Sequence, residues 1–269
     1  MEFINLIVQY VNDARPERQA EYEVCFRRNL ANPLVKTIHN LQERSNVIVP
    51  DEFIGHPKYR QHDLNRWLSY ADAFSYANST LAGETCCLTN LDIFLDTSPK
   101  WLEMQELLSR QMIFCLSRTE YSLDGQTWID PNMLKWALAV SQDAWIFRAP
   151  IYVENCDFGL GTLGCDNAIA HRIKKSGYTP VNAAQQFKIF HLDRARDKSY
   201  VNHINIYTQE RQGAALGQFP ERQGQFLLPD IDLCKSVDQI LNELKIGDLM
   251  RYTVVCEVLS KLVTLKNEH

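Results

Sequence analysis

The sequence predicts an α/β fold, in which helices flank a mostly parallel central sheet and a helical extension follows at the C-terminus. Short apolar segments rich in β-branched residues alternate with longer segments of helical periodicity, an order typical of strands joined by helical crossovers. Of the 269 residues, 45 % are hydrophobic and 23 % are charged, which suits a globular chain with a large core. Polar clusters also follow several predicted strands, and parallel sheets bind ligands at those ends.

The predicted elements alternate along the first 200 residues, and no linker divides them. Proline suits the first helical turn and glycine suits a helix end, so Pro16, Gly83 and Gly177 mark helix boundaries. Segment 118–142 reads mostly as loop, with a helical turn near 131–139. The predicted strands are 3–11, 34–41, 46–50, 85–90, 111–117, 144–150 and 186–192, and the predicted helices are 16–29, 63–83, 99–110 and 167–177.

The C-terminal part, residues 201–269, is expected to pack on the domain formed by residues 1–200. It begins with a polar segment, 211–226, which is either a mobile lid or an ordered surface loop. Two helical patterns follow at 233–244 and 248–262, and their mixed charge favours docking on the domain.

Charge and composition exclude several classes of protein. A formal charge of −5, from 28 basic and 33 acidic residues, argues against a dedicated nucleic-acid binder. No apolar run approaches the roughly 20 residues of a membrane span, and the first residues do not resemble a secretory signal. The eight cysteines are irregularly spaced without a C-x-x-C pair, so we expect buried thiols and no zinc site. These features predict a soluble cytoplasmic protein.

The stretch TNLDIFLD places polar residues at the end of a predicted strand. Asn90 and Asp92 offer an amide oxygen and a carboxylate, a pair that can hold Mg²⁺ or Mn²⁺ together with substrate phosphates and water. Asp96 lies where it can cap the helix that opens at Pro99. The alternative is that all three polar residues only form turns and caps.

A second polar cluster, FHLD, follows the last predicted strand. His191 is a candidate third metal ligand, and the alternative is a histidine hydrogen-bonded at a sheet edge. Asp193 receives no role from the sequence.

Two carboxylates are candidate general bases. Asp166 fits a helix N-cap, and a helix N-terminus is expected to lower its pKa, which leaves an ionised and modest base. Asp143, which we expect just before a strand, is its rival. Cys165 is a less favoured candidate as an activated thiol, because the nearest histidine, His171, points elsewhere on the helix.

Arginines and one tyrosine are candidates for binding a nucleotide. Arg66, Arg118 and the group Arg194, Arg196 and Lys198 are candidate phosphate ligands, although most arginines are simply solvated. Tyr10, after the first strand, either stacks on a nucleobase or belongs to the core.

The ordered set of motifs INLIVQYVND, NLDIFLD, CLSR, SQDAWIF, GCDN and FKIFHLD resembles bacterial and viral glycosyltransferases of the GT-A type. The resemblance covers roughly residues 3–200 and rests on the order of the motifs. It implies a single Rossmann-like GT-A catalytic domain that binds a nucleoside-diphosphate sugar and transfers the sugar to a hydroxyl of a glycan or other acceptor. Such transfer serves glycan or polysaccharide biosynthesis.

The resemblance also implies roles for single residues. Gln9, Tyr10 and Asn12 fall where the loop after the first strand meets the nucleotide. Asn90 and Asp92 match the first and last positions of the family's D-x-D metal motif, and an asparagine in the first position weakens that site.

The late motifs complete the expected machinery. His191 matches the histidine that completes the metal and diphosphate site, and Asp166 matches the base of inverting members. The implied cofactor is Mn²⁺ or Mg²⁺, and the implied reaction inverts the anomeric carbon, with retention as the alternative. The alternatives are a silent member that binds sugar or protein, or another metal-dependent enzyme that uses nucleotides.

Overall fold

The computed structural model describes residues 3–43, 46–108, 111–131, 138–139, 141–161, 164–194, 228, 230–233 and 239. Its centre is a seven-stranded sheet in the order β10-β6-β9-β4-β1-β2-β3. Every pairing in it is parallel except the two made by β9. The predicted mostly parallel α/β architecture is therefore confirmed. The strands are β1 (Ile4–Val8), β2 (Val35–Gln42), β3 (Tyr59–Asp63), β4 (Thr85–Thr89), β6 (Met112–Ser117), β9 (Gln142–Arg148) and β10 (Thr179–Val181).

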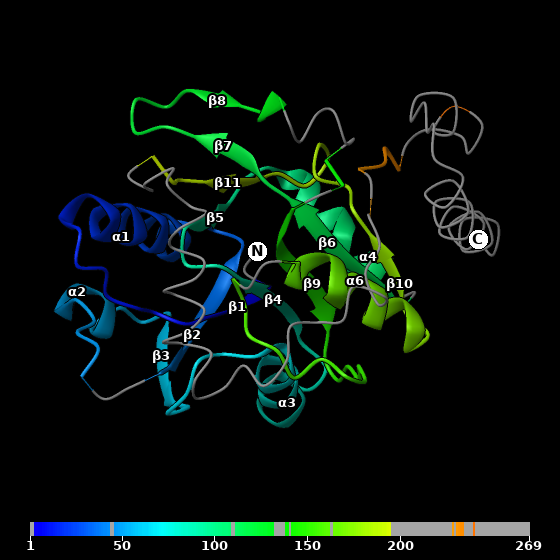
Figure 1. Ribbon diagram of the computed structural model, residues 1–269, viewed down its shortest axis with the longest axis horizontal. Coiled ribbons are helices and arrows are strands. Elements are labelled where there is room, and N and C mark those ends of the chain that lie inside the picture. The colour runs from blue at the N-terminus through cyan, green and yellow to red at the C-terminus, as the bar shows by residue number, and fades with distance from the viewer. Residues whose placement is uncertain are drawn as a thin grey trace.

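A second, four-stranded sheet in the order β5-β11-β7-β8 lies along the top of the view in Figure 1. β11 pairs antiparallel with β5 and parallel with β7, so it joins two segments that are distant in sequence. This sheet brings the residues after β4 next to the residues after β11. Its strands are β5 (Ile93–Leu95), β7 (Thr119–Tyr121), β8 (Thr127–Trp128) and β11 (Ile189–His191).

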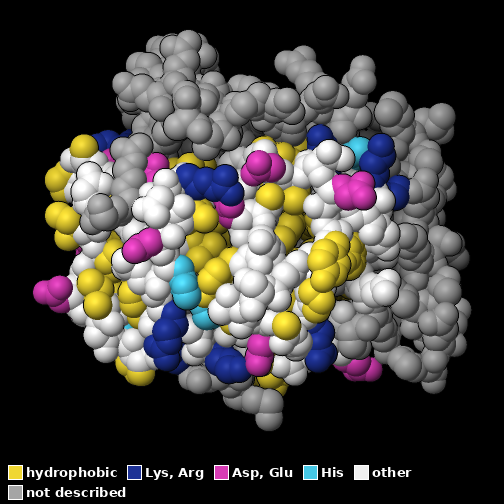
Figure 2. Space-filling model, turned by 90° about the horizontal axis from the view of Figure 1, so that it is seen from below, with side chains coloured by type: hydrophobic (Ala, Val, Ile, Leu, Met, Phe, Trp, Pro, Cys, Tyr) yellow, Lys and Arg dark blue, Asp and Glu magenta, His cyan; other side chains and the backbone are white. Residues whose placement is uncertain are grey.

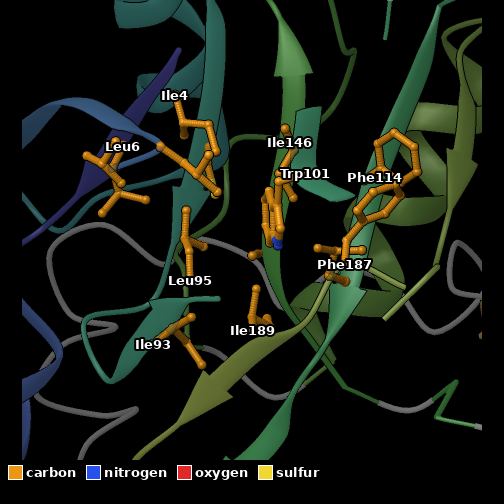
Figure 3. Packing of buried hydrophobic residues seen from close by; sticks show 14 of the residues in the cluster. Ile4, Leu6, Ile93, Leu95, Trp101, Phe114, Ile146, Phe187 and Ile189 are labelled. Atoms are coloured by element: carbon orange, nitrogen blue, oxygen red, sulfur yellow. The ribbon is translucent and has the colours of Figure 1, made fainter. Parts of the chain in front are cut away.

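Helices cover both faces of the central sheet, as the alternating sequence pattern predicts. One core cluster joins the sheet to α1, α2, the 3₁₀ turn η1, α4 and the small sheet, and the other joins it to α3 and α6. Figure 3 shows the first cluster, in which Ile93, Leu95 and Ile189 of the small sheet meet Ile4 and Leu6 of β1. The helices are α1 (Pro16–Ala31), α2 (Asp51–Ile54), α3 (Tyr70–Thr80), η1 (Pro99–Leu102), α4 (Glu103–Leu108) and α6 (Cys165–Lys175).

Several predicted elements differ from the structure for local reasons. Residues 46–50 form no strand, since Pro50 ends the segment and α2 begins at once. β3 was not predicted because only Tyr59 of its five residues is buried, which leaves no apolar alternation. α3 begins at Tyr70, later than predicted, because Ser69 and Asp72 form a capping box.

The segment predicted as loop between β6 and β9 contains the hairpin β7–β8, whose side chains are polar or half-exposed. Asp96 does not cap the following 3₁₀ turn; Ser98 does, by accepting a hydrogen bond from the backbone of Lys100. The proposed lid 211–226 and almost all of the two C-terminal helical patterns lie outside the described residues. Among the helices that are described, none has the length and apolar character needed to cross a membrane. On the face seen in Figure 2, acidic and basic side chains are interspersed.

Candidate active site

The carboxyl edge of the central sheet brings predicted polar residues together around the start of β9. Because β9 is antiparallel, its first residue, Gln142, lies beside Ser117 at the end of β6. The Asn90 side chain, after β4, donates a hydrogen bond of 3.0 Å to Asp143 Oδ1. Asp166, at the start of α6, accepts one of 3.3 Å from the backbone of Gln142. Asp143 is the second residue of β9, whereas the sequence pattern predicts it just before the strand.

Arg118 links this group to the small sheet. Its Nη1 donates to Asp143 Oδ2 over 2.9 Å and to Ser141 Oγ over 2.6 Å, and its Nε donates to Glu120 Oε1 over 2.8 Å. The guanidinium thus has carboxylate partners on both sides. A donor phosphate that binds Arg118 must share it with these carboxylates.

His191 lies between two carboxylates. Its Nδ1 is 2.8 Å from Glu120 Oε2, and its Nε2 is 3.3 Å from Asp92 Oδ2. Burial by itself lowers the pKa of His191. The charge of Asp92 and the hydrogen bonds to Asp92 and Glu120 outweigh burial and raise this pKa to about 9. Burial by itself raises the pKa of Glu120. The hydrogen bond and charge of His191, together with the guanidinium of Arg118, outweigh burial and lower this pKa to about 2. His191 is therefore an imidazolium at neutral pH, paired on both sides.

Asp92, His191 and Asp193 form a group whose ligand atoms all lie within 4.8 Å of one another. Two carboxylates and an imidazole are suitable ligands for Mg²⁺ or Mn²⁺, so the group can hold a metal ion. An ion bound to His191 must take the place of a ring proton, because an imidazolium has no lone pair to offer. The residues therefore fit a metal ion in type and spacing, and loading an ion releases a proton.

Arg18, on α1, reaches into the same group. Its Nη2 is 2.5 Å from Asp92 Oδ2, and its Nη1 is 2.8 Å from Asp193 Oδ1 and 2.9 Å from Glu21 Oε2. Its side chain is only 4 % exposed. Among the described residues, the positive charge nearest to Asp92 is thus the Arg18 guanidinium.

The Asp92 carboxylate is mostly buried, although it follows the end of a strand. The side chain is 13 % exposed and pairs with Arg18 and His191. The pairing arises because β11 runs antiparallel to β5 and sets His191 opposite Ile93, the residue after Asp92.

Asp166 departs from the sequence prediction in two ways. The N-cap of α6 is Gly164, with φ at 81°, and Asp166 lies in the first turn. The expected low pKa is wrong: burial, together with the nearby Asp143 charge, raises the pKa of Asp166 to about 6, despite backbone hydrogen bonds that lower it. A carboxylate with this pKa is a stronger base at neutral pH than an ordinary aspartate.

Two of the predicted nucleotide-binding residues lie in the interior. The ring of Tyr10 is fully buried and makes edge contacts with Phe26 and Phe53, in agreement with its alternative role in the core. Gln9 is buried as well, and its side chain donates to the backbone of Leu41 and Arg66. Both side chains therefore stabilise the interior next to the carboxyl edge of the sheet and do not face a ligand there.

Asn12 and Arg66, which are also predicted to bind the nucleotide, are accessible. Asn12 forms two hydrogen bonds with the backbone of Ile48, which ties the loop after β1 to the loop after β2. The Arg66 side chain is 54 % exposed and contacts Asp72. These two loops and Arg66 can meet a ligand at the carboxyl edge of the sheet.

The alternative of a reactive thiol at Cys165 is not supported. Burial, together with the charge of Asp166, raises the pKa of Cys165 to about 12, so it is a neutral thiol at physiological pH. Its Sγ lies 3.5 Å from the hydroxyl of the buried Tyr70.

Sequence reasoning missed Arg18, Glu21 and Glu120 as members of the site. One signal was present for the first two. The buried side of α1 carries polar residues at helical spacing, namely Arg18, Glu21, Cys25 and Asn29. Two charged residues therefore lie on the helix face that points to the interior. Glu120 carried no such signal, because its strand is short and partly exposed.

No protein-family model matches the chain, and no curated protein matches it in sequence. Among solved structures, the chain is similar to residues 1–349 of S. aureus TarS in complex with UDP-GlcNAc, with a TM-score of 0.50 and 7 % sequence identity over 97 % of this chain and 72 % of that one. A second structure of S. aureus TarS 1–349 gives a TM-score of 0.42 and 9 % identity over 98 % and 71 %. At this identity, the first similarity shows that the two chains share a fold.

Proposed function

We propose that this chain is a glycosyltransferase that moves a sugar from a nucleoside-diphosphate sugar to a hydroxyl of a glycan or other acceptor. The fold is shared with a protein that holds UDP-GlcNAc, a donor of this class. The observation that carries the proposal is Asp166, a partly buried carboxylate with a pKa near 6 at the ligand-binding edge of the sheet. It lies beside a second group of charged residues suited to a diphosphate site.

In the proposed reaction, Asp166 takes the proton from the acceptor hydroxyl as the hydroxyl oxygen attacks the anomeric carbon. The bond from that carbon to the diphosphate oxygen breaks, and the electron pair leaves with the nucleoside diphosphate. A single displacement from the opposite face inverts the anomeric configuration. A pKa near 6 suits this role, because the base is ionised at neutral pH and still basic enough to accept a proton.

Asp143 is the rival base, and its contacts favour a different role. Its carboxylate is held by Arg118, Ser141 and Asn90, all within hydrogen-bond distance. Both of its oxygens are therefore already engaged by donors, which leaves the carboxylate poorly placed to meet an acceptor hydroxyl. We therefore assign Asp143 to positioning Arg118 and to raising the basicity of Asp166.

The donor is proposed to bind across the loops that follow β1, β2 and β4. Asn12 is exposed and the Arg66 side chain is 54 % exposed, so both are accessible to a donor, and Arg118 is proposed to bind the leaving diphosphate. A divalent ion, Mn²⁺ or Mg²⁺, held by Asp92, His191 and Asp193, would supply positive charge to the departing diphosphate. Asn90 faces Asp143 in this structure, which leaves the ion without the first ligand of a D-x-D pair.

The class of donor is tested by measuring thermal unfolding with UDP, GDP, dTDP, CDP and CMP, each with and without Mn²⁺. We expect one nucleoside diphosphate to raise the unfolding temperature in proportion to its binding free energy. Stabilisation by none at millimolar concentration contradicts the proposal and favours a silent binding protein.

Asp166→Asn tests the base once the donor is known. The variant should bind the nucleoside diphosphate as the wild type does, yet release it from the nucleotide sugar at a rate lower by roughly 10²-fold to 10⁴-fold. Asp157→Asn is the matched control, because Asp157 is an exposed carboxylate in the loop before α6. Loss of nucleotide binding in Asp166→Asn removes Asp166 from the role of base.

A further inference from the structure

The Arg18 guanidinium lies where the carboxylates of the candidate metal site converge. It contacts Asp92 over 2.5 Å and Asp193 over 2.8 Å, which are two of the three possible metal ligands. The third, His191, is 3.3 Å from the same oxygen of Asp92. The guanidinium and a metal ion would therefore compete for the same two carboxylates.

The surroundings of Arg18 hold it in this position. Its Nη1 also donates to Glu21 Oε2 and to the backbone oxygen of Leu192, each over 2.9 Å. Its Cζ lies 4.5 Å from the centre of the Tyr22 ring, at cation–π distance. Arg18, Glu21 and Tyr22 all come from α1, so the helix itself presents the cation to the site.

The local charge balance still favours an added cation. In the described part of the chain, five carboxylates make ion pairs with Arg18, Arg118 and His191; they belong to Glu21, Asp92, Glu120, Asp143 and Asp193. Even with His191 protonated, the carboxylates outnumber the cations. A divalent ion is therefore attracted to the group, but Arg18 occupies its carboxylates.

We propose that Arg18 is the resident cation of the Asp92–His191–Asp193 group and that a divalent ion binds there only by displacing the guanidinium from the two aspartates. The protein keeps its acidic group neutralised without metal, and its affinity for metal is set by this competition. This inference concerns the metal-free contacts of Arg18 and does not depend on sugar transfer.

The experiment compares Mn²⁺ binding to the wild type and to Arg18→Met without nucleotide, by equilibrium dialysis and by thermal unfolding. Methionine keeps an unbranched apolar chain and removes the charge. We expect the wild type to bind Mn²⁺ weakly and Arg18→Met to bind it more tightly by at least about tenfold, because a repelling cation is gone from the first contact shell. Mn²⁺ should also raise the unfolding temperature of Arg18→Met more than that of the wild type.

Arg28→Met is the matched control, because Arg28 lies on the same helix but stacks on Phe94 and Tyr121. Its Mn²⁺ affinity should equal that of the wild type. Adding Asp92→Asn to Arg18→Met should abolish the gained affinity and thereby locate the ion.

Two results overturn the proposal. One is tight, micromolar Mn²⁺ binding by the wild type, which shows that Arg18 does not compete. The other is an Arg18→Met protein that folds but gains no affinity. If Arg18→Met does not fold, Arg18→Lys decides in its place. The lysine keeps the charge but cannot span both aspartates, so its Mn²⁺ affinity should exceed that of the wild type, and equal affinities contradict the competition.

Because the ion is measured without donor or acceptor, these outcomes stand apart from the test of glycosyl transfer. A chain that fails to bind any nucleoside diphosphate can still show the exchange between Arg18 and Mn²⁺.

Discussion

Replacing Asp166 by asparagine is expected to stabilise the folded protein at neutral pH while it slows transfer by orders of magnitude. Folding raises the pKa of this carboxyl from 3.8 to about 6. At 1.36 kcal/mol per pKa unit, keeping the carboxylate ionised at pH 7 costs the folded state about 3 kcal/mol. Asparagine has nearly the same shape and no charge, so it removes this cost. Its amide group replaces one accepting oxygen near the Gln142 N–H, which costs about 1 kcal/mol, and the net gain is about 2 kcal/mol.

The sign of the pH dependence follows from the direction of the shift. Between pH 3.8 and about 6 the folded state binds more protons at Asp166 than the unfolded state does. The contribution of Asp166 to the unfolding free energy of the wild type therefore falls through this window as pH rises. Asp166→Asn lacks this contribution. The difference in unfolding free energy between the two proteins should grow from pH 4 to pH 6 and then stay constant.

Urea unfolding of both proteins at several pH values between about 4 and 8 measures this difference. Asp157→Asn, which changes an exposed carboxylate, should follow the wild type at every pH. A pH-independent difference, or an Asp166→Asn protein less stable than the wild type at pH 7, would contradict a raised pKa at Asp166. In that case Asp166 would be held by its hydrogen bonds and would not be the desolvated base proposed above.

Three further changes test other parts of the site. Gln9→Ala should lower the unfolding free energy by about 2–3 kcal/mol, measured in urea, because buried backbone groups lose their side-chain partners; an unchanged value would mean that water replaces the amide. Asp92→Ala should lower it by about 3–5 kcal/mol in addition to abolishing transfer, since it leaves Arg18 and His191 short of a counter-charge; a variant as stable as the wild type would contradict the ion-pair geometry. Cys165 should resist iodoacetamide at pH 8 in the folded protein and react after unfolding, because burial keeps it a thiol, and rapid labelling of the native protein would disprove this.

Local sequence patterns predicted most of the central sheet. β1, β4 and β6 are apolar runs buried on both faces, and such runs need no knowledge of their neighbours to be recognised. β3 and β8 escaped prediction because they lie at sheet edges and expose most of their side chains, and β7 escaped it because its three side chains are only partly buried. β5 and β10 were also not predicted, although all of their residues are buried, because each strand is only three residues long.

The candidate site divides in the same way. The motif order pointed to both Asp92, which follows an apolar run that marks a strand end, and Asp166, which was predicted at the start of a helix. The predicted lowering of the Asp166 pKa is wrong, because a helix terminus can be predicted from sequence but burial beside Asp143 cannot.

The fold class, the approximate ends of the predicted strands and the types of polar residue that lie there all follow from the sequence alone. These properties depend on residues near one another in the chain. Only the tertiary structure decided which charges pair. Arg18 meets Asp92 because α1 packs against β5, and His191 meets the same carboxylate because β11 pairs with β5. An ion pair depends on distances of a few ångströms between segments far apart in sequence, and those distances are set by sheet order and helix packing.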